Sequence, residues 1–300
     1  MAKTRFPKDR GLTARMGLTI FFIGLLYAAV VGALLAFRFS IAFVGVIAGG
    51  LLFIQYFFSD KIALAAMRAQ IVTPAEAPEL HALVDRLCAL ANMPKPRVAI
   101  ANNDLPNAFA TGRNPSNAVV CATTGLLRRL NEEELEAVIS HELSHVAHRD
   151  VAVMTIASFL GMVAGFLTRI ELWSGAAFGG GRRDNNQSEG FGLIVFLATI
   201  VVYAISFLLT RTLSRYRELA ADRSGAILTG RPSSLKSALI KITGEMGRIP
   251  TRDLRSASAF NAFYFAPALT KDSIGGIFST HPSLEKRIAQ LDKIERELSK

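Results

Sequence analysis

The sequence predicts a mainly α-helical membrane protein with a small β-sheet, in which four transmembrane helices carry one α+β domain assembled from two segments. The chain of 300 residues is 51% hydrophobic but only 19% charged, and its mean hydropathy is +0.33. A soluble domain carries about 25% charged residues. The apolar excess is concentrated in four uncharged runs. Roughly 200 residues remain outside these runs, which is enough for one ordinary domain core.

The four runs are long enough to cross a bilayer, since roughly 20 apolar residues span its hydrocarbon core. They are Met16–Phe37, Phe39–Ser59, Val151–Thr168 and Gly190–Thr210. Only Arg38 separates the first two, which are therefore expected to form a tight helical hairpin. A cleaved signal peptide is the alternative for the first run, but a core of 22 residues is too long for one. A buried core helix is the alternative for the third run, because its 18 residues are marginal for a span.

Basic residues before the first run predict a cytoplasmic N-terminus, because Lys and Arg are enriched on that side of the membrane. They are Lys3, Arg5, Lys8, Arg10 and Arg15, against the single acid Asp9. Residues 1–59 and 151–210 are then two transmembrane hairpins. Residues 60–150 and 211–300, with the C-terminus, emerge on the cytoplasmic side as the two halves of one domain. The Gly-rich segment Arg169–Glu189 is expected to lie outside.

The net charge of +10 does not indicate a nucleic-acid-binding protein, because no basic stripe interleaved with aromatic residues is present. Lys and Arg instead cluster beside the apolar runs, which fits contact with anionic lipid headgroups. The two cysteines, Cys88 and Cys121, form no metal-binding pattern and support no disulfide framework. They are expected to be small buried residues.

The motif His141-Glu142-Leu143-Ser144-His145 lies on a predicted helix. Asn131 and Glu134 have the spacing of a capping box at the start of this helix. Two histidines four positions apart on a helix point the same way and can present two nitrogens to one zinc ion. Glu142 lies beside them, where it can accept a proton from water. The alternative is a solvated helix face with two surface histidines.

A catalytic zinc site needs a third protein ligand. The position six residues after His145, where metzincins have a histidine, is Val151, and His148 on the same helix cannot easily complete a tetrahedral site. Glu218 and Asp222, again four apart, are better candidates: Glu218 would complete the ligand set, and Asp222 would orient a ligand histidine by accepting its N–H. The spacing fits a pair of surface acids equally well, but Glu218 and His145 lie near the same membrane face.

These features together resemble a known family. The His141–His145 motif, the Glu218 and Asp222 pair, the flanking spans and the segment Ser279-Thr280-His281-Pro282 are similar to those of the HtpX-like membrane zinc metalloproteases, gluzincins whose family also includes the CAAX prenyl proteases. The resemblance covers essentially the whole chain. It implies a zincin-type cytoplasmic domain and a multi-pass protein of the bacterial inner membrane.

The resemblance also implies roles for individual residues. One zinc ion per chain would be bound by His141, His145 and Glu218, with Glu142 as the general base. His281 would stabilise the tetrahedral intermediate. The segment Pro106–Gly112 resembles a substrate-side strand, which implies substrate binding by Asn107, Ala108 and Phe109. His148 stands where another small polar residue is expected, a departure that does not affect the zinc ligands.

Several segments have more than one interpretation from the residues alone. A strand after Leu105 could bind an extended peptide at a sheet edge, but an ordinary internal strand is the interpretation that the residues favour. His281 could equally be a residue without a catalytic role that precedes the start of a helix near Ser283. The loop Arg248–Gly276 could be a lid, a membrane-dipping segment or, as its aromatic residues favour, part of the core. Residues Ser283–Lys300 have the apolar spacing of an amphipathic helix.

The predicted function is a zinc-dependent endopeptidase that cleaves misfolded or damaged membrane proteins on the cytoplasmic side, in stress-related quality control. A transporter or channel with a structural zinc is disfavoured, because none of the four runs contains an Asp, Glu, Lys, Arg or His residue. A catalytically weak zinc-binding scaffold is the main alternative, and a prenyl-protein peptidase ranks behind it. The expected partners are the membrane and unfolded or membrane-protein substrates, with self-cleavage or a homo-oligomer left open.

Overall fold

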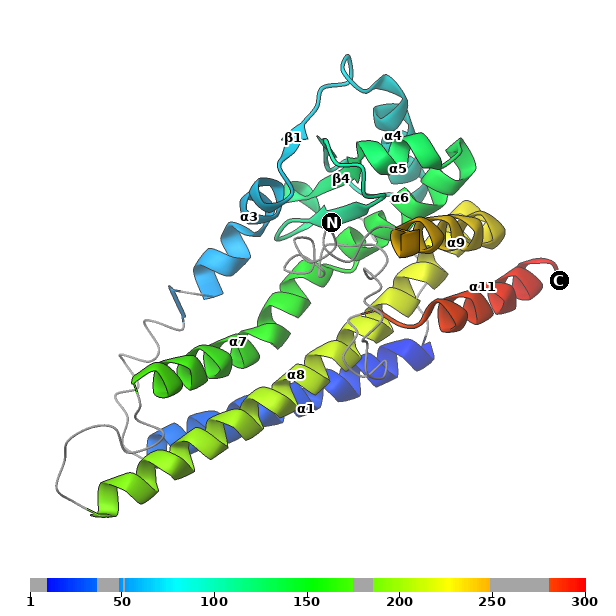
Figure 1. Ribbon diagram of the computed structural model, residues 1–300. Helices are drawn as coiled ribbons and strands as arrows, with labels where there is room; N and C mark the ends of the chain where they lie inside the picture. The colour runs from blue at the N-terminus through cyan, green and yellow to red at the C-terminus, as the bar shows by residue number, and fades with distance from the viewer. Residues whose placement is uncertain (1–9, 37–48, 51, 175–185, 249–280) are drawn as a thin grey trace.

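The computed structural model describes residues 10–36, 49–50, 52–174, 186–248 and 281–300. Within them, a small sheet with short helices forms one end of the molecule, and long helices extend away from it (Figure 1). The mainly helical architecture with a small sheet is thus confirmed. Residues 249–280 lie outside the described part, and with them almost all of the loop Arg248–Gly276.

The sheet has four strands in the order β1-β2-β4-β3, comprising β1 (Ala69–Ile71), β2 (Arg97–Ala101), β4 (Val119–Thr123) and β3 (Ala108–Thr111). The pair β2–β4 is parallel, and β1 and β3 add to it as antiparallel edge strands. All five residues of β4 are buried, as expected for a central strand. Since β3 lies at an edge, the interpretation of this segment as an internal strand is wrong.

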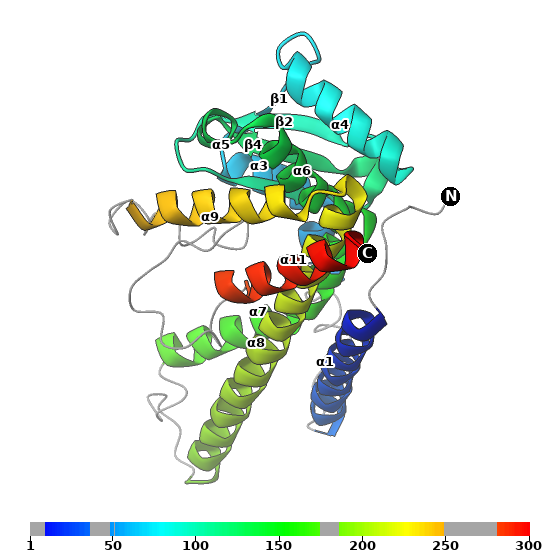
Figure 2. The same cartoon turned by 90° about the vertical axis from the view of Figure 1, so that its right-hand side faces the viewer.

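Three shorter helices surround the sheet together with α6 (Glu132–Ala147) (Figure 2). They are α3 (Ser59–Ala66), α4 (Pro78–Ala91) and α5 (Thr124–Arg129), and a 3-10 turn covers Pro115–Asn117. The bounds of α4 follow from its sequence: Pro78 occupies its first turn, and Asn92 ends it in the left-handed conformation.

Helix α6 carries the His141–His145 motif through the middle of the domain. Its predicted capping box is confirmed: the Asn131 side chain accepts the Glu134 N–H at 2.9 Å, and the Glu134 carboxylate accepts the Asn131 N–H at 3.0 Å. Most of the helix is buried, including Val138 and Ile139. The histidines therefore project into the protein rather than from a solvated face.

The second half of the chain packs against α6. It comprises α9 (Pro232–Arg248), α11 (Leu284–Leu298) and the end of α8 (Asn186–Thr229). One hydrophobic cluster includes Val138 of α6, Leu239 of α9 and Leu291 of α11. The two segments that the sequence predicts as halves of one domain thus share a core. Helix α11 agrees with the predicted C-terminal amphipathic helix, and Ser283 caps its start.

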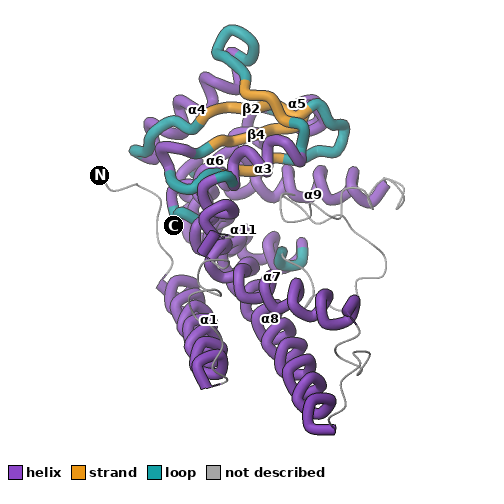
Figure 3. Tube along the Cα trace, turned by 90° about the vertical axis from the view of Figure 1, so that its left-hand side faces the viewer, coloured by secondary structure: helices purple, strands orange, loops and turns teal. Residues whose placement is uncertain are grey.

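Three long helices, α1 (Arg10–Ala36), α7 (Asp150–Ser174) and α8, extend away from the sheet (Figure 3), and both α1 and α7 contact α8. Among the described residues, two helices are long and apolar enough to cross a membrane, Arg10–Val30 and Phe196–Thr229, and Asp150–Phe159 is a shorter apolar stretch. Large apolar side chains on both are exposed, such as Phe21 and Val201. These two helices support the first and fourth predicted spans. About half of the second predicted span lies outside the described residues, and the third corresponds only to the shorter apolar stretch. Helix α8 continues beyond the predicted end of its span at Thr210.

Candidate active site

Three side chains from two helices converge at the centre of the molecule. His141 and His145 come from α6 and Glu218 comes from α8, and their ligand-type atoms all lie within 4.8 Å of one another. The Nε2 atoms of the two histidines are 3.1 Å apart. The Glu218 carboxylate lies 3.4 Å from Nε2 of His145 and 3.7 Å from Nε2 of His141. The sequence predicted this set, and the structure brings it together.

A metal cation fits this donor set. The Nδ1 atom of His141 lies 2.9 Å from the Asp222 carboxylate, and that of His145 lies 2.5 Å from Asp150. An imidazole that donates its Nδ1–H to a carboxylate keeps a lone pair on Nε2. The two Nε2 lone pairs and the Glu218 carboxylate then face one another and repel. A cation bound between them would remove this repulsion, because all three groups would coordinate it. Two imidazoles and one carboxylate are a donor set typical of catalytic zinc.

Burial fixes the charge state around this centre. His141 is 1% exposed, and burial lowers its pKa, although the hydrogen bond to Asp222 opposes this change. The neutral imidazole, which is the metal-binding form, is therefore favoured. Asp222 itself is fully buried and lies where the sequence predicted an orienting carboxylate.

Asp222 is held by an arginine from the end of the chain. Arg287 of α11 donates from Nε to the Asp222 carboxylate at 2.8 Å and from Nη2 at 2.6 Å. Both side chains are almost fully buried, so each charge compensates the other in a site that excludes water. The α11 helix thereby reaches the metal-type cluster through Asp222.

Glu142 lies between α6 and the edge strand β3. The backbone N–H of Ala110 donates a hydrogen bond to its carboxylate. Burial raises the pKa of Glu142 to about 8; the charge on Glu218 adds to this increase, and His145 opposes it. A carboxyl group that titrates near neutrality can both take up and release a proton.

The predicted substrate residues lie at the start of this edge strand. Asn107 is fully buried and exchanges two hydrogen bonds with Thr123: its N–H donates to the hydroxyl, and its carbonyl accepts the Thr123 N–H, each at 2.9 Å. Ala108 and Phe109 are also buried, at 1% and 4% exposure. Any contact of a peptide with this strand would therefore involve its main chain rather than these side chains.

His281 comes close to the cluster, whereas His148 does not join it. Nδ1 of His281 lies 2.9 Å from the Glu218 carboxylate, and the side chain is buried. His281 therefore contacts a predicted metal ligand as well as preceding α11. His148 ends α6 and donates from Nδ1 to the Ser144 carbonyl oxygen at 2.8 Å, within its own helix turn. His148 was not expected in the ligand set, because one straight helix cannot easily arrange three ligands tetrahedrally around a metal.

The sequence analysis missed three charged residues of the site: Asp150, Arg217 and Arg287. Asp150 directly precedes the third apolar run, and its carboxylate contacts His145. Arg217, which is 3% exposed, forms an ion pair with Asp150. Arg287 could have been identified from the sequence, because it lies three positions after Leu284 and four before Leu291, on the apolar stripe of its helix. A charge at such a position requires a buried partner.

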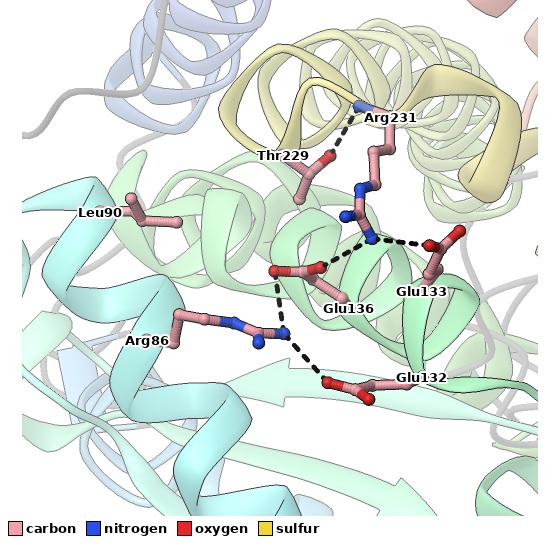
Figure 4. A pocket seen from close by; sticks show the side chains of 7 residues that line it. All are labelled: Arg86, Leu90, Glu132, Glu133, Glu136, Thr229 and Arg231. Atoms are coloured by element: carbon pink, nitrogen blue, oxygen red, sulfur yellow. Dashed lines mark hydrogen bonds and ion pairs between the residues drawn. The ribbon is translucent and has the colours of Figure 1, made fainter.

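A separate cavity of about 390 Å³ lies at the N-terminal end of α6 (Figure 4). It is lined by Arg86, Leu90, Glu132, Glu133, Glu136, Thr229 and Arg231. Its charged groups pair with one another: Arg86 and Arg231 lie 3.2 Å and 3.7 Å from the Glu136 carboxylate, and Arg231 lies 3.1 Å from that of Glu133. None of the seven lining residues belongs to the histidine cluster, so this cavity is not the active site.

Comparison with known proteins gives the family. The model of peptidase family M48 matches residues 74–295, which include the complete histidine cluster. The chain belongs to peptidase family M48. It is therefore a metalloprotease, a hydrolase that acts on peptide bonds. Metalloproteases of this family are zinc-dependent, and the donor set of this M48 peptidase suits that ion.

Curated relatives match over nearly the full chain. The "Protease HtpX homolog 1" of Streptomyces coelicolor is 58% identical over 99% of this chain and 97% of its own length. The "Protease HtpX homolog 2" of Methanosarcina mazei is 50% identical over 99% and 100%. The "Protease HtpX homolog" of Pyrococcus furiosus is 41% identical over 96% and 98%.

A solved structure shares the fold. The crystal structure of S. mikatae Ste24p aligns with a TM-score of 0.51 and 18% sequence identity, covering 92% of this chain and 66% of that chain. At this level of identity, the match concerns the arrangement of elements alone. Together with the two long apolar helices, the relatives support a membrane protein.

Proposed function

We propose that this chain is a zinc-dependent endopeptidase of the membrane that cleaves misfolded or damaged membrane proteins on the cytoplasmic side, in protein quality control. The observation that carries the proposal is the convergence of His141, His145 and Glu218, because Glu218 is on the same helix as a predicted membrane span. Chain continuity along α8 supports a site close to the apolar stretch. A membrane-protein segment would therefore reach the site without a long excursion from the bilayer.

In this proposal, His141, His145 and Glu218 hold the zinc, and Asp222 orients His141 through Nδ1. Zinc at such a site supplies Lewis-acid polarisation of the scissile carbonyl and of water. Glu142 takes the proton from the attacking water and passes it to the leaving amine. His281, which lies against Glu218, donates a hydrogen bond to the oxyanion of the tetrahedral intermediate.

The substrate is proposed to bind as an extended strand along β3. This strand is a sheet edge, and its Ala110 N–H already contacts the general base Glu142. Main-chain hydrogen bonds recognise any extended peptide, which suits the cleavage of many different damaged proteins. Asn107 would fix the start of the strand through its paired hydrogen bonds with Thr123.

Four spans with both termini in the cytoplasm are proposed for the chain, at Met16–Phe37, Phe39–Ser59, Val151–Thr168 and Gly190–Thr210. The basic N-terminus supports this orientation. Residues 60–150 and 211–300 would then form one peptidase domain at the bacterial inner membrane, in agreement with their shared core. The orientation can be measured with the variants Arg5→Cys and Gly180→Cys, labelled in sealed cells by a thiol reagent that does not cross the membrane. Only the cysteine introduced at position 180 should react.

The decisive experiment compares the chain with Glu142→Gln in lipid nanodiscs, each given zinc and one of two substrates. The substrates are a marginally stable membrane protein and a stabilised variant of the same protein. Cleavage of the first alone, dependent on zinc and on Glu142, is the expected result. If both chains bind zinc and neither cleaves either substrate, the scaffold function replaces the peptidase in this proposal. Equal cleavage of both substrates would refute a role in quality control.

A further inference from the structure

His145 is connected through two ionic contacts to the helix pair α7–α8. Its Nδ1 lies 2.5 Å from one oxygen of Asp150, the first residue of α7. The other oxygen of Asp150 forms an ion pair with Nη2 of Arg217 on α8. Arg217 is only 3% exposed, and its buried charge is compensated by this ion pair with Asp150 and by the charge of the neighbouring Glu218.

The contact between His145 and Asp150 depends on a break between α6 and α7. In a continuous helix, residues five positions apart lie about 140° apart around the axis, so their side chains would not meet. Here α6 ends at Ala147, and Arg149 adopts a φ of 57°, in the left-handed region. This conformation is rare for a residue other than glycine, asparagine or aspartate. The turn brings the Asp150 carboxylate back onto the imidazole.

The α7–α8 pair holds Asp150 in place. The Thr210 hydroxyl of α8 donates to the Ala157 carbonyl oxygen of α7 at 3.1 Å. Ala157 and Leu213 are buried in a small apolar cluster with Ile23 of α1. Both Asp150 and Arg217 are thus carried by helices that contact each other just beyond the site; α7 and α8 both lead away from it in Figure 1.

We infer that Asp150 is a positioning residue for His145, and that Arg217 fixes Asp150 so that the α7–α8 pair sets the orientation of one metal ligand. This inference rests on the proposed ligand role of His145. A carboxylate that accepts the Nδ1–H fixes the tautomer and ring orientation of a histidine and increases the basicity of Nε2. Asp222 has the same relation to His141, so each histidine is oriented from a different direction.

The competing explanation is that Asp150 and Arg217 are a structural ion pair with no effect on His145. The two explanations differ for a double variant. Asp150→Asn alone removes the ion-pair partner of the buried Arg217 and should lower the melting temperature. Asp150→Asn combined with Arg217→Gln removes both charges of the ion pair, so neither is left buried without its partner. A positioning role of Asp150 is lost in both variants.

The test uses the full chain in detergent, with melting temperature and zinc affinity measured by competition with a chromophoric chelator. Zinc binding is expected to be about 10- to 100-fold weaker in both variants, the usual effect of losing such a carboxylate. The melting temperature should recover in the double variant. Asp85→Asn is the matched control, because Asp85 is exposed and pairs with Lys95; both measurements should stay at the wild-type level.

Wild-type zinc affinity in the stable double variant would overturn the inference, because charge balance alone would then explain the pair. His145→Ala separates this failure from that of the proposed function. If His145→Ala binds zinc as tightly as the wild type, the proposed ligand set is wrong. If His145→Ala weakens binding and the double variant does not, only the positioning role is wrong.

Discussion

Arg287 and Asp222 form a two-point hydrogen-bonded ion pair, at 2.8 Å and 2.6 Å, in the interior of the protein. Arg287 is 2% exposed, and Asp222 is fully buried. Asp222 also contacts Nδ1 of His141, so the pair connects the C-terminal helix α11 to a predicted zinc ligand. The docking of the last helix is therefore part of the construction of the site.

The first prediction concerns this ion pair. Arg287→Met keeps the length of the side chain but leaves the Asp222 carboxylate buried without its counter-charge. Removing one partner of a buried pair costs about 3–5 kcal/mol. We expect a loss of this order in thermal unfolding, together with weaker zinc binding, because Asp222 would no longer be held against His141.

The matched control is Arg223→Met. Arg223 pairs with Glu297 at 3.0 Å near the surface, and exposed pairs contribute about 0–1 kcal/mol. Zinc affinity should be unchanged in this control. Equal effects of the two substitutions would mean that the buried pair has no special relation to the site.

The second prediction concerns Gly225, at which α8 packs against the backbone of α6. A Cβ atom at this position would lie 2.9 Å from the backbone nitrogen of His141 and 3.1 Å from its Cα. Gly225→Ala must therefore push α8 away from α6 and separate Glu218 from the histidines. We expect a loss of about 1–3 kcal/mol in stability and weaker zinc binding. Gly244→Ala on α9 meets no atom within 4 Å and should be neutral or slightly stabilising.

The parts of the site that could be predicted from the sequence are those set by local helix geometry. Residues four apart share a helix face, so spacing alone predicts that His141 lies beside His145 and Glu218 beside Asp222. The assignment of Glu218 and Asp222 to the site also needed the predicted membrane topology. The capping box of α6 is equally local. Each of these patterns depends on one helix and on no long-range contact.

The rest depends on contacts between elements. Asp150 reaches His145 only because the chain turns at Arg149, which adopts a left-handed conformation. An arginine at this position does not predict such a conformation. The edge position of β3 follows from strand order, which spacing does not specify. Arg287 differs, because its position on the apolar stripe of α11 is a feature of the sequence from which a buried partner could have been predicted. The partner itself, Asp222, lies 65 positions away and could not be inferred.

The third prediction concerns acid stability. Burial alone would raise the pKa of Glu134, but hydrogen bonds from Lys241, Ser237 and the Asn131 N–H lower it below its ordinary value of 4.5. A carboxyl group with a lowered pKa stabilises the fold above its unfolded-state pKa, and this contribution is lost as the pH falls through the lowered value. Glu134→Gln keeps a side chain suited to the capping box but removes the charge. Its melting temperature should be lower than that of the wild type at pH 7.

The pH series decides this point. The difference in melting temperature between wild type and Glu134→Gln should stay constant above about pH 5 and shrink as the pH falls below about 4. A difference that persists unchanged at about pH 3 would contradict the assigned cause. Glu133→Gln is the control, because the Glu133 carboxylate is largely exposed and forms an ion pair with the half-exposed Arg231; this substitution should change the melting temperature little at any pH.

The fourth prediction concerns removal of the metal. If His141, His145 and Glu218 hold zinc, a chelator should lower the melting temperature of the wild type, because a ligand that binds only the folded state stabilises it by about 2.7 kcal/mol at one hundred times its dissociation constant. His145→Ala should show little response to the chelator. Glu142→Gln should show the full response, because a general base is not a ligand. Loss of the response in Glu142→Gln would place this carboxylate in the metal's own ligand set and would require a different proton acceptor.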